Sequence, residues 1–117
     1  MKYKKKLGEW GELRAKNYLI EKGYHILSLN FSIRSGEIDI IALKQDYLVF
    51  TEVKTRTNTN YGPPQAAVGY RKQEKIKNIA QYYVNLNDYQ EYKIRFDVIA
   101  ITINNQHHNL KHFINAF

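Results

Sequence analysis

Two acidic residues and one lysine lie inside apolar stretches of the sequence. Asp39 stands within EIDIIAL, and Glu52 and Lys54 stand within YLVFTEVKT. Charged groups are costly to bury in such stretches unless they are paired or bind a metal. Two carboxylates suit a hard cation such as Mg²⁺ or Mn²⁺. Such an ion activates water for phosphodiester hydrolysis, and a neighbouring lysine stabilises the charge that develops on the phosphoryl oxygens.

The same three residues have a second interpretation. Lys54 can form a salt bridge with Asp39 or Glu52 on a solvated face of a sheet, and short D…ExK patterns arise often by chance. The apolar residues on either side favour the metal site, because a solvated pair does not require them.

The segments that carry these residues are predicted to be two strands, Glu37–Leu43 and Tyr47–Thr55, since both are rich in β-branched and aromatic residues. The connection at 44–46 is short, which predicts an antiparallel hairpin. Glu52 and Lys54 are two residues apart and therefore point to the same face. Directly facing residues of such a hairpin have Cβ atoms about 4.5–5.5 Å apart, so Asp39 can lie opposite this pair.

The remaining elements are predicted from periodicity and from glycine and proline signals. A helix over Lys4–Lys22 carries a stripe of small and apolar residues, Gly8, Gly11, Ala15 and Leu19, that lets it pack closely against another element. Gly69 is predicted to cap a second helix, Tyr70–Leu86. Its predicted buried stripe consists of Ile76, Ile79, Ala80, Tyr83 and Leu86.

Three further strands are predicted around these helices. They cover Tyr24–Asn30, Lys93–Ile103 and a short final strand at Lys111–Ala116, with turns at Ser35-Gly36 and Asn104-Asn105 and a loop over 57–64. The order is α-β-β-β-α-β with a terminal strand, an α/β fold with a mixed sheet in one domain spanning 1–117. The second helix is a crossover connection, so the strands on either side of it are predicted to be parallel.

Composition restricts the classes of function. The formal net charge is +7, from 18 Lys and Arg against 11 Asp and Glu. This excess favours polyanions as partners, nucleic acid first and an anionic membrane second, and charge alone supports mere solubility about equally. There are no cysteines, which excludes disulfides and thiol catalysis and fits a cytoplasmic protein. The sequence lacks both a secretory signal and an apolar run of about eighteen residues, so no membrane helix is expected.

The motifs taken together resemble the YraN-like family, small bacterial proteins assigned as endonucleases by similarity, within the PD-(D/E)XK nuclease superfamily. The matching motifs span almost the whole chain. They are Gly8-x-x-Gly11-Glu12-x-x-Ala15, Gly36-Glu37-Ile38-Asp39, Leu48-Val49-Phe50, Glu52-Val53-Lys54-Thr55-Arg56, Tyr61-Gly62, Lys72-Gln73, Arg95-Phe96-Asp97-Val98 and Asn115-Ala116-Phe117.

The resemblance implies a restriction-endonuclease-like core, similar to that of archaeal Holliday junction resolvases. It also implies roles for individual residues. Asp39 and Glu52 would be metal ligands, Lys54 the catalytic lysine and Glu12 an outer or third acidic group. The proline that leads the superfamily motif is absent, because Ile38 precedes Asp39.

Other residues are weaker candidates. Lys72 and Gln73 open the second predicted helix, where a helix N-terminus favours anions, so they can contact phosphate; a solvated first-turn lysine is the alternative. Arg56 and Gln65 are further candidates for the nucleic-acid backbone. Glu37 is either an outer group of the site or a surface charge.

Two other features are predicted to be structural. Asp97 is expected to pair with Arg95 or a lysine. His107, His108 and His112 match no zinc spacing, and they are interpreted as ordinary strand and turn residues.

The predicted function is a Mg²⁺- or Mn²⁺-dependent endonuclease acting on DNA, with branched or damaged DNA suggested by the fold alone. The alternatives are a nucleic-acid-binding module that does not cut and an interaction protein. No membrane partner is expected, because there is no basic Trp/Leu-rich amphipathic helix. A homodimer is compatible with this function, since resolvase-like enzymes act as dimers.

Overall fold

The computed structural model describes residues 2–57 and 68–117. Helix α1 (Lys2–Glu21) is followed by β1 (His25–Ile33), β2 (Gly36–Lys44) and β3 (Tyr47–Arg56). Helix α2 (Tyr70–Asn87), β4 (Lys93–Asn104) and β5 (His107–Phe113) complete the chain. The predicted order of elements and the mixed α/β fold class are confirmed.

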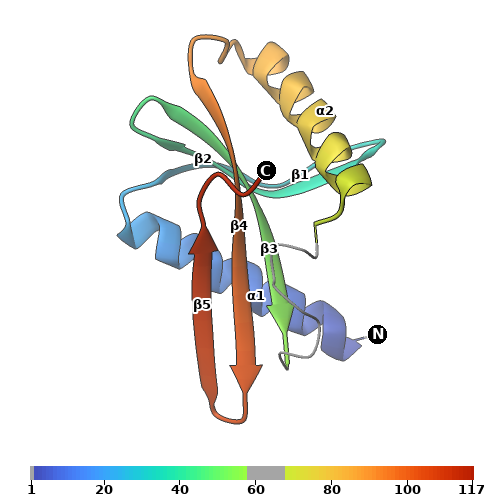
Figure 1. Cartoon of the computed structure of the whole chain (residues 1–117), viewed down its shortest axis with the longest axis vertical. Helices are drawn as coiled ribbons and strands as arrows, with labels where there is room; N and C mark the ends of the chain where they lie inside the picture. Colours follow the sequence, from blue (N-terminus) through green and yellow to red (C-terminus); the bar gives the residue numbers. More distant parts are fainter. Residues whose placement is uncertain (1, 58–67) are drawn as a thin grey trace.

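The strands form one five-stranded sheet in the order β1-β2-β3-β4-β5. Neighbouring strands are antiparallel except β3 and β4, which are parallel because α2 carries the chain back across the sheet. Figure 1 shows the strong twist of this sheet and α2 beside the β1–β2–β3 part of it. Both the hairpin of β2 with β3 and the parallel pairing of β3 with β4 were predicted.

The two helices cover opposite faces of the sheet and close two apolar cores. Alternation along β3 shows this directly, since Phe50 packs in the core under α2 and Val49 in the core under α1. Figure 1 shows α1 crossing behind the sheet. Ala15 and Leu19 on α1 are fully buried, as the predicted stripe requires. β3 therefore contributes side chains to both cores.

The buried stripe of α2 differs from the prediction at one residue. Ile76, Ile79, Ala80 and Tyr83 are buried, but Leu86 is 60% exposed. Tyr89, just beyond the helix, stacks on Tyr83 with ring centroids 6.0 Å apart. This ring fills the core beneath the last turn of α2, and Val84 is the additional buried residue.

The last strand begins earlier than predicted and ends earlier as well, at His107–Phe113 instead of 111–116. The turn after β4 is tight: Asn105 adopts a left-handed conformation (φ 58°), and pairing resumes at once with Asn104 opposite His107. Beyond Phe113 the chain turns away through Asn115 (φ 56°), and the Ala116 amide donates to the Phe96 carbonyl at 2.7 Å.

The first strand runs three residues further than predicted, to Ile33, because β1 pairs with β2 up to Gly36.

Candidate metal and nucleic-acid site

The acidic pair lies where β2 and β3 separate. Antiparallel pairing between these strands begins at the hairpin and ends at Ile40 opposite Thr51. One step further along this register Asp39 faces Glu52. There the backbone N–H of Val53 donates to Oδ2 of Asp39 at 2.8 Å. Where the two strands separate, this side-chain oxygen therefore accepts the hydrogen bond that a backbone carbonyl accepts within the paired strands. Asp39 and Glu52 are only 9% and 3% exposed.

A lysine of α2 pairs with one of the two carboxylate oxygens of Glu52. Its Oε2 forms an ion pair with Nζ of Lys72, which lies 3.0 Å away in the first turn of α2. Its Oε1 is buried and has no hydrogen-bond partner within the described part of the chain. A buried carboxylate oxygen without a partner costs free energy, so a cation or a hydrogen-bond donor at this oxygen would stabilise the protein.

The electrostatics of Asp39 reflect this shortage of positive charge. Burial, followed by the charge of Glu52, raises the pKa of Asp39 to about 7; the Val53 amide and Lys72 offset only part of this, and Glu12 adds to it. At neutral pH the Asp39 carboxyl is therefore protonated for part of the time, because burial and the charge of Glu52 both disfavour its ionisation.

Two lysines border the pair from different elements. Burial and the neighbouring Lys72 lower the pKa of Lys54, although the charges of Glu52 and Asp39 oppose this shift. For Lys72, burial lowers the pKa, but the charges of Glu52 and Asp39 and the side-chain hydrogen bonds with Lys54 and Glu52 together outweigh burial, and the pKa is raised. Lys54 thus lies beside the acidic pair as predicted, whereas the cation that pairs with Glu52 comes from α2.

Glu12 approaches the site from the other face of the sheet. Gly11 allows this approach, because a Cβ at Gly11 would lie 1.8 Å from Oγ1 of Thr55 on β3. Asn30 donates to Oε1 of Glu12 at 2.8 Å, and the charge of Glu12 contributes to the raised pKa of Asp39. Within residues 2–57 and 68–117, no three His, Cys, Asp or Glu side chains form a group able to hold an ion. Glu12 thus acts on the charge of Asp39 from α1, and Asp39 and Glu52 are the two buried carboxylates of this region.

The weaker candidates are spread around this centre. Arg56 ends β3 and is half-buried. The side-chain amide of Gln73 donates to the Val68 carbonyl at 2.9 Å, so it is engaged at the start of α2. Glu37 accepts from Ser32 Oγ at 3.1 Å. The predicted loop from residue 58 onward and Gln65 lie outside the described residues.

A second buried carboxylate has the opposite environment. Asp97 is fully buried and receives two hydrogen bonds from Arg95, at 2.9 and 2.8 Å, which confirms its predicted structural pairing. His112 Nε2 lies 2.7 Å from Oδ2 of Asp97, and the Asn115 amide donates to Oδ1 at 3.0 Å. His112 lies on β5, as interpreted from the sequence, and its side chain is also a partner of this cluster; its other ring nitrogen lies 3.1 Å from the hydroxyl of Tyr18.

The sequence carried a signal for this contact. A two-residue turn after Asn104 sets a register that places His112 opposite Ile99, and Ile99 lies two residues from Asp97 on the same strand face.

None of the described helices is long and apolar enough to cross a membrane. The model of the uncharacterised protein family UPF0102 matches residues 11–101, which include all the acidic and basic residues of the site. A UPF0102 protein of Caldanaerobacter subterraneus is 46% identical, covering 97% of this chain and 96% of its own. Proteins of the same family from Clostridium acetobutylicum and Clostridioides difficile are 46% and 42% identical, each over 97% of this chain and over 94% and 97% of their own.

Proposed function

The chain belongs to the UPF0102 family, and from its own site we propose that it is a Mg²⁺- or Mn²⁺-dependent endonuclease that hydrolyses phosphodiester bonds in DNA. The observation that carries the proposal is the buried, unpartnered Oε1 of Glu52 beside Asp39. Family membership confirms the predicted resemblance to YraN-like proteins, and the uncharacterised family description leaves the activity to be argued from these residues.

The donor set fits a magnesium-type ion. Mg²⁺ is bound through one or two carboxylates, several waters and substrate phosphate oxygens, so two ligands from the protein are enough. Asp39 and Glu52 would hold the ion, which would activate a water and neutralise charge on the phosphoryl oxygens. The raised pKa of Asp39 agrees with this, since a cation at the pair would favour ionised Asp39 and offset its repulsion with Glu52.

The two lysines act on the substrate in this proposal. Lys54 shares the strand face of Glu52 and extends toward the place where the scissile phosphate would lie, so it stabilises the charge of the transition state. Lys72 neutralises Glu52 in the free protein and is 45% exposed. Once a cation takes over that task, the ammonium group of Lys72 is available to a phosphate oxygen.

A module that binds nucleic acid without cutting is the second candidate. The observation that favours it is the ion pair between Lys72 and Glu52, which already occupies one oxygen of a proposed ligand. In this case Lys72 would remain on Glu52, no divalent ion would enter, and the basic surface would still attract the phosphate backbone.

A cleavage panel separates the two candidates. Linear duplex, single-stranded, flapped and four-way DNA are incubated with Mg²⁺ or Mn²⁺, with Asp39→Ala as the matched control. The endonuclease proposal expects a cut in at least one of these DNAs that depends on the ion and is lost in Asp39→Ala. DNA binding by gel shift without cleavage of any substrate, in either metal, would support the binding module instead.

A further inference from the structure

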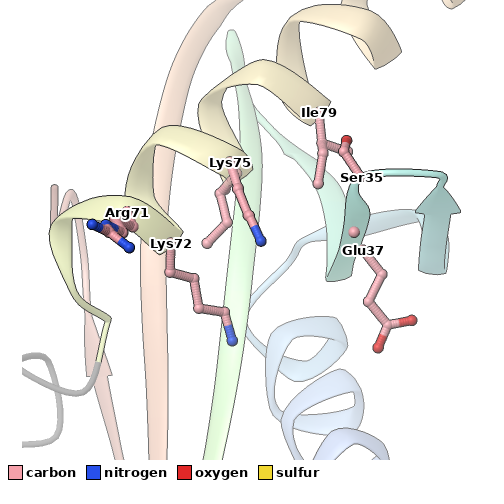
Figure 2. Close-up of a pocket in the computed structure, with 8 residues that line it drawn as sticks. Ser35, Glu37, Arg71, Lys72, Lys75 and Ile79 are labelled. Atoms are coloured by element: carbon pink, nitrogen blue, oxygen red, sulfur yellow. The ribbon is translucent and has the colours of Figure 1, made fainter.

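The two sides of the acidic pair are built from different elements. On the α2 side, an open pocket of about 430 Å³ lies between this helix and the turn that joins β1 to β2. Figure 2 shows Lys72 and Lys75 extending from α2 at this pocket, with Glu37 extending from the start of β2. On the α1 side, Glu12 and Asn30 line a smaller open pocket of about 190 Å³. Water therefore reaches the side chains of Glu12 and Asn30.

Asn30 stands next to Asp39 in the sheet. Strands β1 and β2 are paired on both sides of this position, Leu29 with Ile40 and Phe31 with Ile38. The register therefore places Asn30 of β1 across from Asp39 of β2, on the side away from Glu52 of β3. The side-chain amide of Asn30 donates to Oε1 of Glu12 at 2.8 Å. One residue thus lies beside Asp39 and also holds the carboxylate of α1 whose charge acts on Asp39.

The backbone of Asn30 is unusual for a strand residue. Its φ of 52° is left-handed, a conformation that costs free energy in residues other than glycine and that asparagine tolerates better than most. The other non-glycine residues with positive φ in the described part of the chain lie in turns or at the end of α2; they are Gln45, Asp88, Asn105 and Asn115. Asn30 lies within β1, where it and Leu29 are both exposed, so the alternation of the strand is interrupted. Such an interruption changes the direction of a side chain, and here the side chain contacts Glu12.

We propose that Asn30 is a positioning residue of the metal site, and that it holds Glu12 where its carboxylate accepts hydrogen bonds from the water shell of the ion. Mg²⁺ and similar ions keep several waters when they bind to proteins, and these waters donate to nearby acceptors. Residues that orient the surroundings of a metal change its affinity as well as the reaction. The inference rests on the ion proposed at Asp39 and Glu52. It explains why a left-handed residue lies inside a strand at this one place.

The test measures Mn²⁺ binding in the absence of DNA. Isothermal titration compares wild type with Asn30→Gly, since glycine accepts the left-handed backbone and removes only the amide side chain. Asn30→Gly should bind Mn²⁺ about tenfold more weakly, within the range for residues that orient a metal site. Asn105→Gly is the matched control, because Asn105 is also exposed and left-handed (φ 58°) but lies in the turn after β4. The control variant should bind Mn²⁺ as wild type does.

A double variant separates positioning from a general structural effect. If Asn30 acts through Glu12, Asn30→Gly should weaken Mn²⁺ binding in the wild-type background and have no further effect in the Glu12→Gln background. A residue that only supports folding would cause the same loss in both backgrounds. Melting in EDTA is the second check. Asn30→Gly should melt close to wild type, because glycine tolerates this backbone and the lost hydrogen bond is exposed.

The hydrogen bond itself is tested without metal. In amide NMR spectra recorded in EDTA, the side-chain signals of Asn30 should shift in Glu12→Gln, and those of Asn105 should not. Signals of Asn30 that do not respond to Glu12→Gln would overturn the inference, because the contact would then be absent in solution.

The remaining outcomes separate this inference from the nuclease proposal. Wild-type Mn²⁺ affinity in Asn30→Gly, an equal loss in Asn105→Gly, or an undiminished effect of Asn30→Gly in the Glu12→Gln background would each overturn the positioning role. A protein that binds Mn²⁺ through this contact and never cuts DNA keeps the inference and loses the nuclease proposal. A protein that cuts DNA while Asn30→Gly keeps full Mn²⁺ affinity does the reverse. A wild-type protein that binds no Mn²⁺ would overturn both.

Discussion

Neutralising Asp39 should stabilise the metal-free protein at alkaline pH. The pKa of Asp39 is raised from 3.8 to about 7 by burial and then by Glu52. The unfolded chain ionises near its ordinary pKa, whereas the folded protein retains the proton, so stability falls as pH rises from about 4 to about 7. Above that window the full cost of the charge is present. Asp39→Asn removes this cost and keeps an oxygen that can accept from the Val53 amide.

The size of the effect follows from the shift. About three pKa units at about 1.4 kcal/mol each give an upper figure of about 4 kcal/mol. Water entry and partial protonation of Asp39 reduce this to about 1–2 kcal/mol, or roughly 4–8 °C in melting temperature for a domain of this size. In EDTA, Asp39→Asn should therefore melt higher than wild type at pH 8 and nearly with it at pH 5.

Asp97→Asn is the matched control, because Asp97 is also a buried aspartate of the sheet. Burial opposes its ionisation, but hydrogen bonds from His112 and Arg95 outweigh burial and lower its pKa. Its stabilising effect is present above the ordinary pKa of aspartate and is lost only in strong acid. Asp97→Asn should melt lower at both pH values, by about 3–5 kcal/mol, because a buried pair is broken. Differential scanning fluorimetry measures both variants, and an Asp39→Asn protein that melts lower than wild type at pH 8 would refute the argument.

Four further predictions follow from the same geometry. Millimolar Mn²⁺ should raise the free energy of unfolding of wild type by about 2.7 kcal/mol at a hundredfold excess over Kd, and with it the melting temperature, and should raise that of Asp39→Asn much less. Lys54→Ala should keep Mn²⁺ binding in isothermal titration and lower cleavage by about 10²–10³-fold, whereas Glu52→Ala should lose both; equal loss of metal binding would contradict these roles. Affinity for duplex DNA should fall with salt at a log–log slope near −0.9 per phosphate contacted, with about 4–6 contacts, and a flat response would leave the positive charge as a solubility feature. Gly11→Ala should destabilise the protein by about 1–3 kcal/mol through its clash with Thr55, and Thr55→Ala should restore stability in the double variant.

The fold was predictable because its signals are local. β-Branched and aromatic residues marked β2 and β3, helical spacing marked Ile76, Ile79 and Tyr83, and the crossover rule gave the parallel pair. The errors lie at ends of elements. Leu86 satisfies the helical period, yet the core beneath it is filled by Tyr89, a residue outside the helix. Helical periodicity does not show which element fills a given part of the core.

The site was predictable to the level of the hairpin and no further. Asp39, Glu52 and Lys54 share two adjacent strands, so their proximity follows from one turn. The contact of Lys72 with Glu52 depends on where α2 crosses β3, which no short-range pattern determines. In the same way, the pocket beside this contact combines the first turns of α2 with the β1–β2 turn, more than thirty residues apart in the sequence.

Asp39 and Asp97 show why local sequence alone cannot separate a working carboxylate from a structural one. Each stands between two large apolar residues in a central strand, and each is buried. Distant residues make the difference. Asp97 lies beside the guanidinium of Arg95, the imidazole of His112 and the backbone amide of Asn115, and its pKa is lowered. Asp39 lies beside the carboxylate of Glu52 and accepts from the backbone amide of Val53, and its pKa is raised. The fold compensates one buried charge fully and leaves the other short of positive charge, which is why we propose a cation at Asp39 and not at the stronger hydrogen-bond cluster.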